Sequence, residues 1–168
     1  MLRQSILNAL AEDVGETCNI AMPERHAMVY LDRVETKWPL RIQLPVGTQV
    51  PFHCTASGKM YLSTLKPRLF DKYLKIVALE AHTPHTLTDP AALGAEIARI
   101  RAQGYSTDNE EFMEGMVAIA VPLHDSENRL MSTLSIHAPV QRLGMEGLTA
   151  YLPRLQVAAT DLSELMLQ

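Results

Sequence analysis

The stretches MVAIAVPL (residues 116–123) and RLMSTLSIHA (residues 129–138) decide the fold class. Successive side chains of an extended strand point to opposite faces. The first stretch therefore places a row of branched apolar side chains on one face and small ones, including Ala118 and Ala120, on the other. The second places Leu130, Leu134 and Ile136 on one face, and on the other Met131, Thr133, Ser135 and His137.

If the small and polar faces of these two strands coincide, one side of the sheet is apolar and the other has room and hydrogen-bonding groups. Such a face is typical of the floor of a small-molecule pocket. The alternative is a face covered by a helix, with its hydroxyl groups satisfied locally. The pattern alone leaves both interpretations open.

The rest of the chain surrounds this hairpin with helices and further strands. Apolar spacing predicts helices over 2–14, 55–65, from Pro67 onward, from Asp89-Pro90 to Gly104, and through 148–166. Alternation predicts strands near 18–22, 27–34 and 40–44, and a three-strand meander over 105–138. No strand–helix–strand alternation recurs, so a doubly wound parallel sheet is disfavoured. The expected class is α+β, with an antiparallel sheet of about six strands flanked by helices.

Composition excludes several functional classes. The chain has 168 residues, 47% of them hydrophobic and 20% charged, which predicts one globular domain. The net charge of −4 disfavours a domain whose main task is to bind phosphate backbones. No apolar run reaches the ~20 residues of a membrane span, and the first residues lack the apolar stretch of a signal peptide. Two distant cysteines, Cys18 and Cys54, indicate a reducing cytoplasm.

The segment Thr55–Lys59 is a candidate anion site. A helix that begins there presents free backbone N–H groups and the positive end of its dipole. Thr55 or Ser57 can instead cap the helix and use that capacity. The segment lacks the spacing of a phosphate-binding P-loop, which disfavours nucleotide binding.

Several motifs together resemble one family. LNAL (7–10) and GET (15–17), LPVG (44–47) and VPFHCTASGK (50–59), then GYSTDNEE (104–111), Gly115, AIAVP (118–122) and LSI (134–136) occur in this order. They resemble the effector-binding domain of IclR-type transcription regulators, and the likeness covers almost the whole chain.

The resemblance implies a GAF-like sensor domain over residues 1–168 that binds a small carboxylic acid. It also implies a homodimer or tetramer in the cytoplasm, and a winged helix-turn-helix domain that normally precedes the sensor and alone contacts DNA. That domain is absent from this chain, so Met1 begins either a piece of a longer protein or a naturally short sensor. No catalytic residue, metal ligand, cofactor or membrane contact is expected. By position, the family's ligand contacts fall on Ala56, Ser57, Asp108, Ala118, Ser135 and His137, with the backbone N–H groups of the first two holding the carboxylate.

Two of these positions depart from the family's best-known pattern. Ala118 stands where some members have cysteine, and His137 stands where some have serine. The histidine adds a bulkier hydrogen-bonding group. We therefore expect an acid larger than a very small keto acid, either aromatic or dicarboxylic.

Two other interpretations involve different chemistry. Asp108, Ser135 and His137 can be written as a hydrolase triad, but Ser135 lacks the G-x-S-x-G context, and Cβ atoms two residues apart on a strand are about 7 Å apart, which is long for proton transfer. Cys54 can be written as the thiol of a GAF-like reductase. His53, Cys54, Asp108 and His137 can supply metal ligands, but no spacing is diagnostic.

Overall fold

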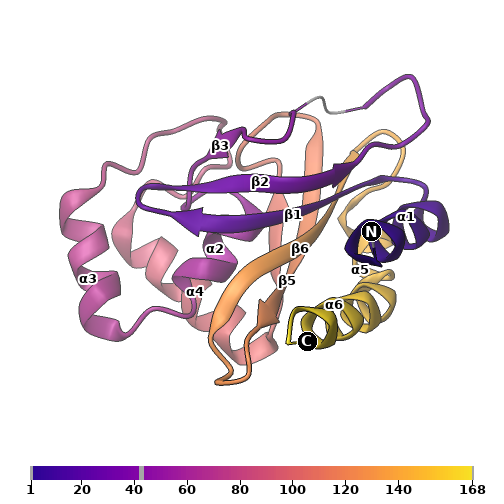
Figure 1. The fold of residues 1–168 in the computed structure, drawn as a ribbon. Helices are drawn as coiled ribbons and strands as arrows, with labels where there is room; N and C mark the ends of the chain where they lie inside the picture. The colour runs from indigo at the N-terminus through magenta and orange to yellow at the C-terminus, as the bar shows by residue number, and fades with distance from the viewer. Residues whose placement is uncertain (1, 42–43, 168) are drawn as a thin grey trace.

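The computed structural model describes residues 2–41 and 44–167, which form one six-stranded sheet with helices on both faces (Figure 1). The strand order is β3-β2-β1-β6-β5-β4, and every neighbouring pair is antiparallel. The strands are β1 (Thr17–Glu24), β2 (Ala27–Val34), β3 (Gln49–Val50), β4 (Ser106–Asn109), β5 (Met116–His124) and β6 (Leu130–Pro139). The predicted α+β class and the antiparallel sheet are confirmed.

Two groups of helices cover the two faces of the sheet (Figure 1). One face packs against α1 (Leu2–Val14), α5 (Met145–Thr149) and α6 (Leu152–Met166), with a core of aliphatic side chains from β1, β5 and β6. The other face carries α2 (Ala56–Leu62), α3 (Pro67–Ile76) and α4 (Pro90–Gln103), whose core includes Tyr30, Phe52 and Phe70. The polar face predicted from β6 lies on this second side.

Local sequence signals set the helix limits. The side chain of Asp89 caps α4 by accepting a hydrogen bond from the N–H of Ala92 at 3.0 Å. Gly104 ends the same helix with a φ of 82°, a left-handed conformation that glycine adopts without steric cost. The apolar pattern of 148–166 predicted one long helix, but the chain forms α5 and then α6. Pro153 lies in the first turn of α6, where its missing N–H has no helical partner to lose.

The register of β5 and β6 confirms that their small and polar faces coincide. Ala118 pairs with His137, and Ala120 pairs with Ser135. Leu134 and Ile136 lie on the opposite face, as predicted. Leu130 does not join them, because the register shifts between Leu123 and His124 and Leu130 packs with the α2–α4 side instead. Such a bulge adds a residue to one strand and reverses the alternation beyond it.

The strand predicted over 40–44 is wrong where the structure describes it. Leu40, Arg41 and Leu44 are not in a strand, and Leu40 is exposed; residues 42 and 43 lie outside the described residues. The edge strand forms later, at Gln49–Val50, where Met28 pairs with Val50. Alternation of polar and apolar residues does not by itself show whether a segment pairs with a neighbouring strand or forms an irregular connection.

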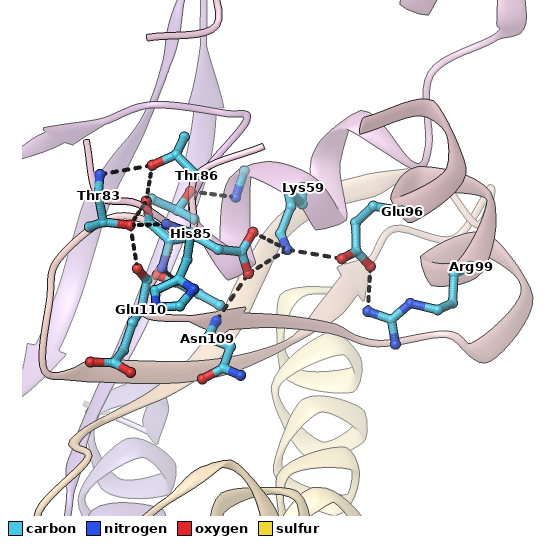
Figure 2. Close-up of polar contacts among 12 residues, drawn as sticks. Lys59, Thr83, His85, Thr86, Glu96, Arg99, Asn109 and Glu110 are labelled. Carbon is cyan, nitrogen blue, oxygen red and sulfur yellow. Dashed lines mark hydrogen bonds and ion pairs between the residues drawn. The ribbon is translucent and has the colours of Figure 1, made fainter. Parts of the chain in front are cut away.

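A buried ion pair joins α2 to the turn between β4 and β5 (Figure 2). The Lys59 ammonium donates to both carboxylate oxygens of Glu111, at 2.7 and 3.0 Å, and lies 3.6 Å from Glu96 on α4. Glu111 in turn accepts from the N–H of Asn109 at 3.0 Å. The Lys59 side chain is fully buried, and these two carboxylates are its ion-pair partners among the described residues. Three elements are therefore fastened at one point.

We predict that Lys59→Met lowers the free energy of unfolding by about 3–5 kcal/mol, because it leaves the Glu111 carboxylate buried without its cation. Arg99→Met is the matched control: Arg99 also pairs with Glu96, but its side chain is 55% exposed, so the expected loss is below about 1 kcal/mol. Urea unfolding of both variants measures the difference. Equal losses would contradict a special role for the buried pair.

Gly58 permits the close approach of α2 to the preceding segment. A Cβ atom there would lie 2.4 Å from the Cα and carbonyl oxygen of Phe52 and 2.6 Å from Thr55 Oγ1. We predict that Gly58→Ala destabilises the fold by about 1–3 kcal/mol or more, because backbone must move. Gly94→Ala in α4 meets nothing within 4 Å and should stabilise by up to about 1 kcal/mol through helix propensity. Thermal unfolding of the two variants tests whether their stabilities change in opposite directions.

Candidate functional site

The start of α2 is the first component of the site. Thr55 caps the helix: its Oγ1 accepts from the N–H of Gly58 at 3.0 Å and donates to the carbonyl of Pro51 at 2.7 Å. The capping alternative is thus correct for Thr55, but the cap uses only the third N–H of the helix. The N–H groups of Ala56 and Ser57 come before the first intrahelical hydrogen bonds. Among the described residues, the Thr55 cap does not use either of them.

A row of residues across three strands lies beneath this helix. Asp108 of β4 pairs with Ala118 of β5, which pairs with His137 of β6. Ser135 lies on the same face, two residues before His137. Ala56 packs directly on Ala118 and Ala120, which joins the start of α2 to the row. The structure therefore brings Ala56, Asp108, Ala118, Ser135 and His137 to one face of the sheet.

All six predicted contacts, including Ser57, are buried. The site is internal to the domain and lies between the sheet and α2.

Ser135 and His137 are in direct contact. Ser135 Oγ lies 3.0 Å from His137 Nε2. The Cβ spacing along a strand predicted that the two groups stay apart, and this prediction is wrong because the imidazole ring reaches back toward the serine. His137 Nδ1, where a catalytic carboxylate would bind in a triad, has no hydrogen-bond partner among the described residues.

Burial determines the charge of His137. Removal from water, and then the nearby positive charge of Arg33, lower the pKa of the imidazole to about 3. The ring is therefore neutral near pH 7, with one nitrogen as a donor and the other as an acceptor.

Asp108 has the opposite shift. Burial, and then the negative charge of Glu111, raise the pKa of Asp108 to about 7, although the N–H of Glu111 donates to its Oδ1 at 2.7 Å. Near neutrality the carboxyl is present in both forms, so it can donate or accept a hydrogen bond.

Three residues of this face, Asn19, Arg33 and Tyr30, were not identified from the sequence. Asn19 pairs with Ser135 across β1 and β6, and its Oδ1 accepts from Arg33 at 2.9 Å. The Arg33 side chain is only 4% exposed, and its guanidinium lies 5.9 Å from the Tyr30 ring centroid. The signal available was the alternation in β1, where Thr17, Asn19 and Ala21 alternate with Cys18 and Ile20. The sequence did not show that β1 pairs with β6.

Several buried polar atoms on this face lack partners among the described residues. They are Ser57 Oγ, Ser106 Oγ, Asn19 Nδ2 and His137 Nδ1. Ser106 belongs to the face because it pairs with Ala120. A buried polar group without a hydrogen bond is costly. These four atoms mark the face as the candidate site.

The metal ligands considered from the sequence do not assemble as one set. Among the described residues, the group that comes together is His53, Cys54 and His82, and it includes neither Asp108 nor His137. Cys54 is a buried free thiol, and burial raises its pKa to about 12, which disfavours a reactive thiolate.

The raised pKa of Asp108 predicts a stability that falls as pH rises. Its folded pKa of about 7 exceeds the ordinary 3.8, so the folded state is favoured most below pH 4 and loses this advantage between pH 4 and 7. Asp108→Asn should therefore be more stable than the parent at pH 8, by up to about 4 kcal/mol, and the gain should shrink at pH 5. Urea unfolding at both pH values measures it. In Asp125→Asn, a change in the exposed hairpin, we expect no such gain; a pH-independent effect of Asp108→Asn would refute the assignment.

Residues 2–164 match the family model described as the bacterial transcriptional regulator IclR C-terminal domain. The chain is 41% identical over 160 residues to a probable transcriptional regulator, SauR, of Cupriavidus necator, covering 95% of this chain and 64% of that protein. It is 31% identical over 148 residues to the transcriptional repressor IclR of Escherichia coli, covering 87% of this chain and 54% of that protein. The chain therefore spans somewhat over half the length of these relatives.

Solved structures agree with the sequence match. Thermotoga maritima IclR superposes with a TM-score of 0.89 at 30% identity, covering 96% of this chain and 65% of that one. The inducer-binding domain of a PobR double mutant from Acinetobacter, in complex with 3-hydroxybenzoic acid, also has a TM-score of 0.89, at 27% identity, covering 96% of this chain and 95% of that one. Among the residues described, no helix is both long and apolar enough to cross a membrane.

These relatives and neighbours are transcriptional regulators, not enzymes, and the fold and the sequence agree over nearly the whole chain. The chain belongs to the IclR family of bacterial transcriptional regulators, as an effector-binding C-terminal domain.

Proposed function

We propose that this domain binds a small carboxylic acid between α2 and the polar face of the sheet. The residues that contact it are Ala56, Ser57, Asp108, Ala118, Ser135 and His137. The observation that carries the proposal is the set of buried polar atoms without partners on this face, Ser57 Oγ and His137 Nδ1 among them. A bound polar molecule supplies the missing hydrogen bonds, which a purely apolar ligand does not.

The charges of the face favour an anion. Arg33, which also pairs with Glu35 at 3.5 Å, places a buried guanidinium near His137, and the N–H groups of Ala56 and Ser57 add two donors at the helix start. Asp108 opposes an anion when ionised, but its raised pKa lets it carry a proton and donate to a ligand oxygen. His137 is neutral and supplies one further donor or acceptor.

The side chains at the site indicate the size of the acid. Ala118 contributes no polar group beneath α2, and the imidazole of His137 reaches farther than a serine hydroxyl would. An aromatic or dicarboxylic acid uses both features. The 3-hydroxybenzoic acid held by the PobR inducer-binding domain is an aromatic acid on a similar fold, which supports the aromatic choice.

In the whole regulator, the domain transmits the binding signal to a DNA-binding domain. Ligand binding shifts an existing equilibrium between domain arrangements, and the spacing of the DNA-binding domains in a homodimer or tetramer changes with it. The length of the relatives beyond the matched region supports this arrangement, and so does the net charge of −4, which is unsuited to direct DNA contact. A regulator of transcription acts in the cytoplasm, where bacterial DNA is located.

The test is a thermal-shift screen of aromatic and dicarboxylic acids, followed by calorimetry on the acid that stabilises the domain. An acid at 100 times its Kd stabilises by about 2.7 kcal/mol. Ser135→Ala should weaken binding about tenfold or more, because a hydrogen bond to a charged group contributes about 1.5–3 kcal/mol.

Ser132→Ala is the matched control for that variant. Ser132 lies on the same strand and is also buried, and its hydroxyl has no partner among the described residues. It pairs with Leu123 and faces the opposite side of the sheet. Its removal should leave the affinity unchanged. Equal losses in the two variants would place the acid elsewhere.

A further inference from the structure

Three side chains able to bind a metal meet outside the proposed effector site. His53 and Cys54 directly precede α2, and His82 lies in the loop between α3 and α4. One ligand atom from each lies within 4.8 Å of the other two. We infer that His53, Cys54 and His82 bind a transition-metal ion of the Zn²⁺ class. This inference does not depend on the proposed effector or its site.

The donor set suits that class of ion. Imidazole nitrogen and thiolate sulfur are preferred ligands of Zn²⁺, whereas Mg²⁺ and Ca²⁺ prefer oxygen. Three protein ligands leave one position of a tetrahedral site for water or another small ligand. A hollow of about 150 Å³ adjoins both histidines, and Glu80 and His26 also line it. There is space for the fourth ligand on this side.

The ring of His53 is already oriented as a ligand. Its Nε2 lies 2.8 Å from the carbonyl oxygen of Glu80, which accepts a hydrogen bond from the Nε2–H tautomer. That bond leaves Nδ1 with its lone pair for a metal. Metal-binding histidines commonly donate their other N–H to a carbonyl in this way.

The loop that carries His82 is fixed in place. The N–H of His82 donates to Thr86 Oγ1 at 3.0 Å. Thr83 and Thr86 then donate to the carbonyl oxygens of Glu110 and Glu111, each at 2.6 Å (Figure 2). The His82 ring centroid lies 5.4 Å from that of Phe112. The ligand is therefore positioned by the fold, although its own side chain reaches the surface.

Binding exchanges a proton for the ion. Cysteine binds a metal as the thiolate and not as the thiol. On binding, the S–H bond breaks, the thiolate coordinates the ion, and the proton leaves to solvent. Because Cys54 adjoins the cap residue Thr55, the ion ties the His82 loop to the start of α2.

The experiment is titration of the purified domain with Zn²⁺ and with Co²⁺. We expect one Zn²⁺ per chain by equilibrium dialysis, release of one proton per ion in calorimetry across buffers, and a sulfur-to-cobalt charge-transfer band with Co²⁺. His82→Ala, an exposed substitution that leaves the core intact, should weaken Zn²⁺ binding roughly 10- to 100-fold or more. Cys54→Ser should abolish the charge-transfer band.

Two matched variants complete the design. His85→Ala removes an exposed histidine from the same loop, and Cys18→Ser removes the other buried free thiol, which lies on the opposite face of the sheet. Both should bind Zn²⁺ with unchanged affinity and retain the cobalt band. Absence of stoichiometric Zn²⁺ binding to the parent domain, or equal affinity in His82→Ala, would overturn the inference. Loss of acid binding in the Ser135→Ala variant has no bearing on this result.

Discussion

The buried ion pair of Lys59 and Glu111 is the constraint on which the arrangement of this domain depends. A fully buried ammonium is tolerated only when carboxylates surround it, and here they come from α4 and from the turn after β4. Asn109, the last residue of β4, donates its N–H to Glu111, and the N–H of Glu111 donates to Asp108. The pair thus fixes the start of α2 over the strand end that carries Asp108.

The burial that strengthens the Lys59–Glu111 ion pair also favours polar ligands on the neighbouring face of the sheet, beneath α2. Burial raises the pKa of Asp108 to about 7, so both of its forms are present near neutrality, and lowers the pKa of His137 to about 3, so the imidazole is neutral. Arg33, which also pairs with Glu35, is a positive charge close to His137, and Lys59 acts on Asp108. A guanidinium, a carboxyl that can carry a proton, a neutral imidazole and several polar atoms without partners among the described residues can together hydrogen-bond a negatively charged molecule. The face has a small apolar floor at Ala118 and Ala120, on which Ala56 packs.

Much of the fold was predictable because its signals are local. The helix over 2–14, the cap at Asp89, the stop at Gly104 and the alternation in β5 and β6 depend on neighbouring residues, and each is confirmed. The failures are non-local. The strand expected at 40–44 had the right alternation but no partner where it is described, and Leu130 changed face because a bulge in its hairpin cannot be seen in one strand.

For the site, the sequence by itself determined which residue types share a strand face, because alternation is a property of the backbone. It also indicated that a helix begins near Thr55, with Thr55 and Ser57 as alternative caps, and the structure shows that Thr55 is the cap. Only the tertiary structure decided that Ser135 touches His137, that Arg33 and Asn19 join them, and that His82 meets His53 and Cys54. These contacts join segments far apart in the chain or depend on how a ring turns, and strand register and loop path, not local spacing, bring such groups together.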